Sequence, residues 1–250
     1  MATPYFQLRR ESVPSTQDVA REALEGATPL DLASPGRSPL TRGDKAQPGE
    51  GGSVAVLVVA ARQTEGRGRA GASWLTAERA LAASLALRVD PGESRPLSLM
   101  AGVAAAGLGF GVELKWPNDV MVGDSKAGGI LVERSGDIAV IGLGLNLWWP
   151  GAPEGMCGLF ADDPGGGRHA ELGALWGAGM MRLLDDRGWP RERYKALCST
   201  LGREVTWEPE GSGKAVDVDH SGALIVEDEE DELLTVTSGA VRHVRPNPHT

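Results

Sequence analysis

The sequence predicts an α+β fold, with a mixed sheet and flanking helices in residues 1–200 and a small β-barrel in residues 201–250. Three observations predict it. From residue 54 onward, apolar strand-like runs alternate with helical segments. A pair of short strands surrounds the turn at Pro117. After residue 201 the pattern changes to short strands separated by turns rich in Gly and Asp, which is typical of a small barrel.

Local patterns justify the individual elements. Residues 53–60 form a continuous, β-branched apolar run, as expected of a strand buried on both faces. Ser15 and Thr16 precede a good helix start at residues 18–24, so either side chain can serve as its N-cap. Further helices are expected at 97–107, 169–186 and 191–199, and short strands at 204–207, 215–218, 223–226, 233–237 and 240–244.

Two stretches lack a regular period. Residues 26–52 contain repeated Pro turns, which predict a flexible insertion on the surface. Residues 150–167 are dense in Gly and Pro. Either stretch could gate a pocket, but this composition favours loose tethers.

Composition and charge disfavour several classes of protein. A net charge of −9 argues against a nucleic-acid partner, which rewards a basic surface. No apolar run approaches the roughly 20 residues of a membrane span, and the N-terminus lacks a basic-then-apolar leader. Cys157 and Cys198 suit a reducing compartment, and the scattered histidines suggest no metal cluster. We therefore expect a cytoplasmic protein with no membrane or nucleic-acid partner.

The strand at 53–60 leads into a loop, residues 61–71, in which Gly and Arg alternate. Glycines allow a backbone to approach a ligand closely. Arg67 and Arg69 add forked donors that match phosphate or carboxylate oxygens. In an acidic chain this local positive charge predicts a site for an anion, and a solvated surface loop is the plainer alternative.

Gly66, Gly68 and Gly71 also satisfy G-x-G-x-x-G after a strand, with Asp90 at about the distance that a dinucleotide-binding unit requires. Such units usually have small or apolar residues between the glycines, whereas two arginines stand there in this chain. A nicotinamide-dependent enzyme is therefore a less favoured alternative.

A second polar cluster surrounds Pro117. Residues 114–120 form a turn at the end of a strand, with Lys115 and Asp119 at its two ends, and Lys126 returns on the next strand. Two cations and a carboxylate in apolar sequence suit an anionic small molecule better than they suit a core. The alternative is a polar hairpin in which Lys and Asp pair with each other.

Four motifs, in this order, resemble those of the biotin–protein ligases, also called biotin–[acetyl-CoA-carboxylase] ligases. They are Pro-Ser-Thr-Gln at 14–17, the glycine–arginine segment 63–74, Lys-Trp-Pro-Asn-Asp at 115–119 with 126–133, and Ile-Gly-Leu-Gly-Leu-Asn-Leu at 141–147. The resemblance implies a class II synthetase-like mixed sheet for a catalytic domain in residues 1–200, and an SH3-like domain in 201–250. Because the first motif begins by Ser15, it also implies a single-function ligase without the N-terminal DNA-binding domain of many relatives.

The resemblance implies a reaction in two steps. The biotin carboxylate attacks the α-phosphate of ATP, which gives biotinoyl-5′-adenylate and pyrophosphate. A lysine amine of a biotin carboxyl-carrier domain then attacks the acyl carbonyl and releases AMP. Both steps spread or transfer negative charge, and neither needs an enzyme nucleophile. ATP and biotin are the expected substrates, Mg²⁺ the expected metal, a carboxylase carrier domain the expected partner, and a monomer or homodimer the expected assembly.

The same resemblance implies the site residues. The biotin pocket is expected to contain Ser15, Thr16, Gln63, Arg67, Gly68, Lys115, Gly128 and Gly129, and the nucleotide site Arg69, Trp74, Asn118, Lys126, Asn146 and Trp148. The expected catalytic residues are Lys115, Arg67 and Arg69. Lys115 would offset charge beside the carboxylate and α-phosphate, and Arg69 would help retain the adenylate. Asp119 would orient Lys115 or help hold Mg²⁺.

The chain departs from the family pattern at two places. The arginine that usually follows Gly71 is replaced by Ala72, and the expected Gly-x-Asn-Leu is replaced by residues 78–81, where Arg79 could supply the missing charge. Two alternatives stay open. One is a lipoate or octanoate ligase-like acyl transferase, although the Arg-Arg-x-x-Gly-Gly-Gly-Ala signature is absent. The other is a non-catalytic biotin-binding protein.

Overall fold

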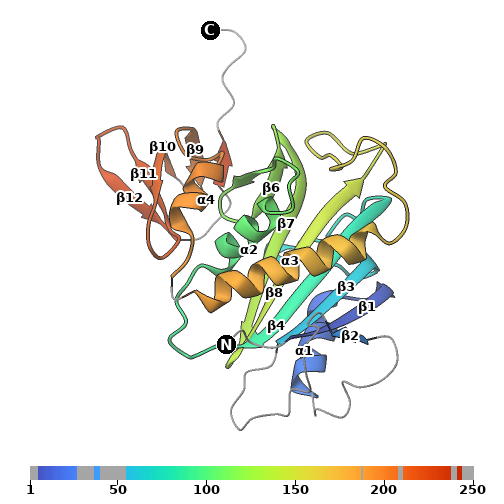
Figure 1. Ribbon diagram of the computed structural model, residues 1–250. Coiled ribbons are helices and arrows are strands. Elements are labelled where there is room, and N and C mark those ends of the chain that lie inside the picture. The colour runs from blue at the N-terminus through green and yellow to red at the C-terminus, as the bar shows by residue number, and fades with distance from the viewer. Residues whose placement is uncertain are drawn as a thin grey trace.

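Eight strands form one mixed sheet across the larger part of the protein (Figure 1). The computed structural model describes residues 5–26, 37–39, 55–186, 188–207, 211–237 and 241–243. The strand order is β2-β1-β3-β4-β8-β7-β6-β5, in which β1 and β3 are parallel and the other neighbours antiparallel. The bounds are β1 (Tyr5–Val13), β2 (Arg37–Pro39), β3 (Ala55–Gln63), β4 (Arg79–Arg88), β5 (Glu113–Lys115), β6 (Asp119–Val122), β7 (Ser125–Ser135) and β8 (Ile138–Trp148).

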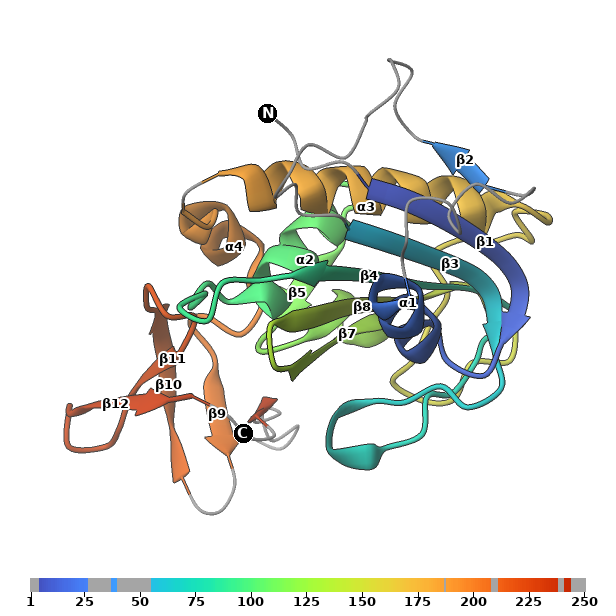
Figure 2. The ribbon, with the colours of Figure 1, turned by 90° about the horizontal axis from the view of Figure 1, so that it is seen from below.

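Helices cover both faces of this sheet. The helices α2 (Leu97–Ala106) and α3 (Arg168–Asp185) lie on one face, and α1 (Thr16–Glu25) lies on the other (Figure 2). Because both faces are covered, β3, β4 and β8 are apolar along most of their length. Helix α3 approaches the sheet closely at Gly177, where an added Cβ would lie 2.5 Å from Leu57.

The α1 face has the smaller core. Helix α1 packs on an apolar cluster that consists of Leu8, Ala20, Leu24, Val56, Val58, Ala86, Ile138 and Val140. Beyond this cluster, the same face of β8 carries Gly142 and Gly144, because side chains alternate between the faces of a strand. The α1 face is therefore not filled by large side chains there, which leaves room for a cavity.

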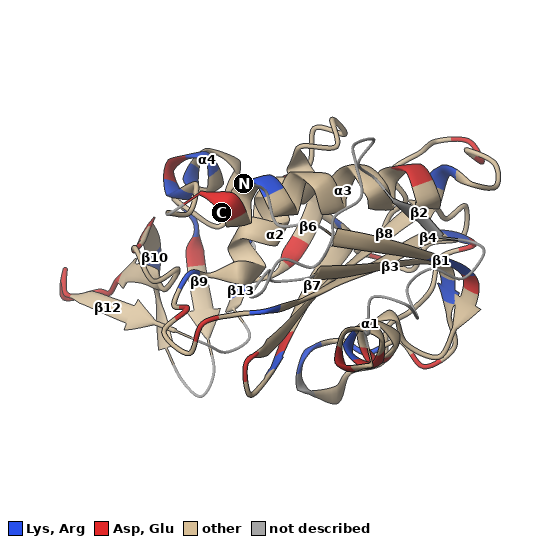
Figure 3. Cartoon of the chain, turned by 60° about the horizontal axis from the view of Figure 1, so that its bottom comes forward, with Lys and Arg blue, Asp and Glu red and all other residues tan. Residues whose placement is uncertain are grey.

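A second, five-stranded antiparallel sheet follows the short helix α4 (Arg191–Leu197). Its strands are β9 (Glu204–Trp207), β10 (Gly211–Val218), β11 (Leu224–Glu227), β12 (Leu233–Val236) and β13 (Val241–His243), in the order β12-β11-β10-β9-β13. Arg191 of α4 donates to Val218 O and to a carboxylate oxygen of Asp217, both at 2.5 Å, so the sheet is tied to the helix. Acidic residues lie at its outer turns (Figure 3).

Most predicted elements agree with the structure to within a few residues, but there are three differences. The strand β1 was not predicted, because charged residues interrupt its apolar pattern. Within the predicted insertion 26–52, residues 37–39 form β2, and the rest, apart from Gly26, lies outside the described residues. The structure also rules out the dinucleotide-binding alternative that the sequence disfavoured, because β3 and β4 are antiparallel and the described residues 72–78 between the glycine loop and β4 form no helix.

The third difference concerns residues 150–167, which are not a loose tether. Backbone hydrogen bonds join Lys126 N to Gly155 O (2.8 Å), Cys157 N to Lys126 O (3.0 Å) and Leu159 N to Asn146 O (2.9 Å). The segment is therefore fixed along β7 and β8. Among the described residues, no helix is long and apolar enough to cross a membrane.

Candidate active site

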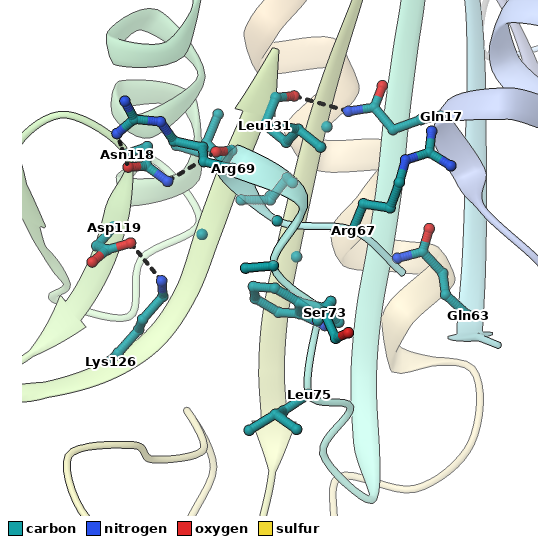
Figure 4. A pocket seen from close by; sticks show the side chains of 18 of the residues that line it. Gln17, Gln63, Arg67, Arg69, Ser73, Leu75, Asn118, Asp119, Lys126 and Leu131 are labelled. Atoms are coloured by element: carbon teal, nitrogen blue, oxygen red, sulfur yellow. Dashed lines mark hydrogen bonds and ion pairs between the residues drawn. The ribbon is translucent and has the colours of Figure 1, made fainter. Parts of the chain in front are cut away.

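A cavity of about 350 Å³ opens on the α1 face, between α1, the glycine–arginine loop and the turn at residues 116–119 (Figure 4). Predicted site residues that line it are Ser15, Thr16, Gln63, Arg67, Gly68, Arg69, Trp74, Asn118, Asp119, Lys126, Gly129 and Asn146. These residues come from four separate sequence motifs, which the fold brings together. Three other predicted site residues, Lys115, Gly128 and Trp148, are described by the structure but do not line this cavity.

Glycines shape the floor of the cavity. An added Cβ at Gly144 would lie 2.6 Å from the Trp74 ring, and one at Gly142 would lie 2.6 Å from Nε2 of Gln17. Both side chains therefore reach across β8 only because these positions have no side chain. Gly128 has another role. A Cβ added at this position would lie 2.5 Å from the carbonyl oxygen of Gly144, so the glycine allows β7 and β8 to pack closely.

One end of the cavity carries buried, neutral hydrogen-bonding groups. Gln63 Oε1 accepts hydrogen bonds from the backbone N–H of Thr16 (2.7 Å) and from its hydroxyl (2.9 Å). The Thr16 hydroxyl also lies 2.8 Å from Ser84 Oγ. Sequence reasoning missed Ser84, although a serine inside the apolar run of β4 was a usable signal. Ser15 occupies the N-cap position of α1, but its side chain makes no capping hydrogen bond.

Gln17 also belongs to this neutral end. Its Nε2 donates to Leu131 O at 2.9 Å, while its buried Oε1 has no partner. Gln17 lines the cavity, and its unpartnered buried oxygen is unfavourable in this arrangement.

The glycine–arginine loop extends two arms in different directions (Figure 4). Arg67 donates to both carboxylate oxygens of Asp18, at 2.8 and 2.7 Å, and its Nη2 lies 3.6 Å from Glu133. The hydrogen bond to Arg67 holds the pKa of Asp18 below its ordinary value. Arg69 instead donates to the neutral Oδ1 of Asn118 at 3.1 Å. Among the described residues, no carboxylate forms an ion pair with Arg69, so its charge is available to a ligand.

The other end of the cavity is charged. Lys126 Nζ lies 2.6 Å from Asp119 Oδ1, which is the Lys–Asp pairing considered as a plain alternative from the sequence. Asn118 Nδ2 donates to Ile130 O at 3.1 Å, which fixes the amide that bonds Arg69. Asn146 Oδ1 is buried without a partner. This end therefore combines two cations, a carboxylate and amide groups, which suits a phosphate-bearing ligand.

Three expected contributors lie elsewhere. Lys115 is on β5, and its charge acts on His243 of the C-terminal sheet. Arg79 forms an exposed, bidentate ion pair with Asp163, at 2.9 Å, and is not among the described cavity residues, so the suggestion that it supplies the missing charge has no support. Trp148 lines a neighbouring hollow, which shares Met156 with the main cavity. The described residues contain no group of three or more His, Cys, Asp or Glu that could hold a metal.

Comparisons with known proteins give the family. Residues 52–146 match the Biotin/lipoate A/B protein ligase family, and residues 200–244 match the Biotin protein ligase C terminal domain. A Paracoccus denitrificans protein named biotin–[acetyl-CoA-carboxylase] ligase is 34% identical over 213 residues, which are 73% of this chain and 87% of the relative. The chain belongs to the biotin–protein ligases.

Further similarities agree with this assignment. The chain is also 31% identical, over 220 residues, to a Mycobacterium tuberculosis protein named biotin–[acetyl-CoA-carboxylase] ligase; these residues are 76% of this chain and 79% of that one. The solved structure of the Aquifex aeolicus biotin protein ligase in complex with biotin and ATP has the same fold, with a TM-score of 0.69, 22% identity, and coverage of 96% of this chain and 99% of that one. The predicted family and fold class are thus confirmed.

Proposed function

We propose that this protein uses ATP to join biotin to a lysine of a carboxyl-carrier domain through biotinoyl-5′-adenylate. Membership of the family and two relatives named as biotin–[acetyl-CoA-carboxylase] ligases support this proposal. The observation that carries it is the division of one cavity into a neutral hydrogen-bonding end and a charged end. Biotin has a neutral ureido ring and an anionic carboxylate, and therefore needs both kinds of surface.

We assign the neutral end to the ureido ring. The side chains of Thr16, Gln63 and Ser84 offer paired hydroxyl and amide groups, and Gln17 adds an acceptor that has no protein partner. Trp74 supplies an aromatic surface over the glycines of β8. Ser15 and the backbone at Gly68 and Gly129 complete this end.

We assign the charged end to the reacting carboxylate and the nucleotide. Arg69, Asn118 and Asn146 would hold the phosphates and ribose, and Trp148, in the hollow that adjoins at Met156, would contact the base. Lys126 would offset the charge of the carboxylate and α-phosphate during attack. This role was expected of Lys115, but Lys126 is the lysine that lines the cavity.

The two steps then need positioning and charge stabilisation only. A carboxylate oxygen of biotin bonds to the α-phosphorus as the bond to pyrophosphate breaks, and Arg69 and Lys126 stabilise the charge on the phosphate oxygens. A neutral lysine amine of the carrier then forms an amide with the acyl carbon, AMP leaves with the electron pair of the broken C–O bond, and the nitrogen releases one proton to solvent. Asp119 fits a role in holding Mg²⁺ together with the phosphates, where the ion would neutralise phosphate charge.

We also infer that residues 1–200 form the catalytic domain and residues 201–250 the small C-terminal domain. Two free cysteines, Cys157 and Cys198, together with ATP as the substrate, support a cytoplasmic location.

The test is ATP–pyrophosphate exchange with Mg²⁺ and biotin, lipoate, octanoate or no acid, followed by transfer of labelled biotin to a purified carrier domain. Exchange with biotin alone and labelling of the carrier are expected. Exchange with lipoate or octanoate instead would assign the protein to acyl transfer of those acids. Biotin binding without exchange would identify a biotin-binding protein, and would associate the loss of adenylation with Ala72, which stands where the family pattern has arginine.

A further inference from the structure

The turn at residues 116–119 is held from two directions. All four of its residues line the cavity, and Asn118 and Asp119 carry the groups that meet Arg69 and Lys126. From the catalytic side, Ile130 N donates to Asn118 O at 2.9 Å, and Ser98 Oγ of α2 donates to Pro117 O at 3.1 Å. These bonds hold the turn at its two central residues, Pro117 and Asn118.

Trp116, the first residue of the turn, is held by the C-terminal part of the chain. The backbone N–H of Trp116 donates to Thr200 Oγ1 at 3.0 Å, and Thr200 Oγ1 lies 3.1 Å from Nε2 of His243 on β13. The indole N–H of Trp116 donates to Gly222 O, between β10 and β11, at 2.9 Å. Thr200 is fully buried and Trp116 is 2% exposed, so water does not compete for the bond between the Trp116 N–H and Thr200 Oγ1.

The chemistry of Thr200 suits this position. Its oxygen accepts from the Trp116 amide, and the same hydroxyl pairs with Nε2 of His243, as donor or acceptor according to the ring tautomer. Burial and the charges of Lys115 and Arg203 hold the pKa of His243 at about 4, so the ring is neutral at pH 7 and free to accept. Without the Thr200 hydroxyl, the Trp116 amide would be buried without a partner, which is unfavourable.

We propose that Thr200 and His243 are positioning residues, which hold the 116–119 turn and thereby keep Asn118 and Asp119 in register with Arg69 and Lys126. The C-terminal sheet is then part of the framework of the nucleotide end, to which β13 also contributes Val241 as a wall residue. This inference rests on the proposed function for its kinetic consequence. It acts on the reaction through the turn and involves no contact between Thr200 or His243 and a substrate.

The structure predicts a split between the two ends of the cavity. The neutral end is built by α1, β3 and β4, whose Thr16, Gln63 and Ser84 bond to one another. A change at Thr200 should therefore disturb ATP use much more than biotin binding, because only the carboxylate of biotin lies at the charged end while its ureido ring lies at the neutral end. A general loss of stability would instead affect both.

The experiment compares Thr200→Val, which keeps the side-chain volume and removes the hydroxyl, with Thr200→Ser, which restores it. Thr235→Val is the matched control, because Thr235 lies exposed on β12 of the same sheet. Biotin affinity is measured by calorimetry, and kcat and KM for ATP by pyrophosphate exchange. Thr200→Val is expected to lower kcat/KM for ATP about tenfold, or about 1.4 kcal/mol, while biotin affinity changes less than about twofold. Thr200→Ser and Thr235→Val should stay close to wild type.

Hydrogen exchange of the peptide that covers residues 114–122 gives a readout that does not depend on catalysis. Thr200→Val should exchange faster there than wild type, while peptides from α1 and β3 stay unchanged. If wild type shows no biotin-driven pyrophosphate exchange, the proposed function fails and hydrogen exchange still decides the role of Thr200. If Thr200→Val does not fold, His243→Ala replaces it, with the same pattern expected at smaller amplitude.

Two results would overturn the proposal. One is a folded Thr200→Val protein with wild-type kcat/KM for ATP and wild-type exchange at residues 114–122. The other is an equal loss of biotin affinity and ATP use that Thr200→Ser fails to restore.

Discussion

The Arg67 guanidinium makes two hydrogen bonds to the Asp18 carboxylate, at 2.8 and 2.7 Å, and these bonds fasten the glycine–arginine loop to α1. Glu133 on β7 lies 3.6 Å from the same guanidinium. The charge of Arg67 is therefore balanced by protein carboxylates. Its arrangement fits a role in closing the loop over the cavity better than a role in holding a substrate carboxylate, because that substrate would have to displace two anions.

The first prediction concerns this pair. Asp18→Asn should raise KM for biotin about threefold, because a partly exposed but bidentate ion pair contributes up to about 1 kcal/mol. The charge-swapped protein Asp18→Arg with Arg67→Asp should recover part of the loss. Steady-state pyrophosphate-exchange assays measure KM for biotin in Asp18→Asn, in the single variants Asp18→Arg and Arg67→Asp, and in their double variant. If Asp18→Asn keeps the wild-type KM for biotin while Arg67→Ala raises it strongly, Arg67 contacts the substrate directly.

The second prediction distinguishes the two lysines. Lys126→Ala should lower the rate of adenylate formation by at least about a hundredfold, since removing a group that stabilises charge in the transition state typically has an effect of this size. Lys115→Ala should have a much smaller effect, because Lys115 is not among the described residues on the cavity wall. Single-turnover adenylate formation in both folded variants measures the difference. The reverse order would restore Lys115 to the role expected from the sequence.

The third prediction tests the glycine floor. Gly144→Ala places a methyl group 2.6 Å from the Trp74 ring and should push the indole into the cavity, which lowers biotin affinity by about tenfold or more. Gly92→Ala is the control, because the added methyl group has no atom within 4 Å apart from those of residue 92 and its two chain neighbours. Calorimetric titration with biotin compares the two. If Gly144→Ala binds biotin as wild type does, Trp74 does not define the pocket.

The fourth prediction concerns pH. Burial, with the charges of Lys115 and Arg203, lowers the pKa of His243 from 6.5 to about 4, against a smaller opposite effect of Asp124 and Asp119. Below pH 6.5 the unfolded chain therefore binds a proton at this residue that the folded protein does not bind until about pH 4. The free energy of unfolding should therefore fall as the pH is lowered from 6.5 to about 4. Below about pH 4, His243 causes no further loss, because it is protonated in both states.

Urea unfolding between pH 7.5 and 5 measures this effect. His243→Gln should lose less stability over that interval than wild type, because the glutamine does not titrate. Parallel pH dependences in the two proteins would assign the acid sensitivity to other groups, such as His169, whose pKa burial also lowers.

Much of the architecture could be predicted because its signals are local. The apolar run before the glycine loop became β3, and the helical segments that begin at 97, 168 and 191 were found to within two residues of their ends. β1 was missed because only some of its residues are buried, so charged residues interrupt the alternation that marks a strand. Ser84 was missed for a related reason, since an apolar run conceals a single polar residue that faces a cavity.

The sequence by itself determined the family, the α+β fold class and the four motifs that supply most of the cavity. Residue type, order and spacing along the chain carry that information. Only the tertiary structure decided which lysine faces the cavity, that Asp18 engages Arg67, and that Thr200 holds Trp116. These contacts join residues 49 and 84 positions apart in the chain. They depend on strand register and on how the two sheets pack, because a shift of one residue along a strand moves its side chains to the opposite face.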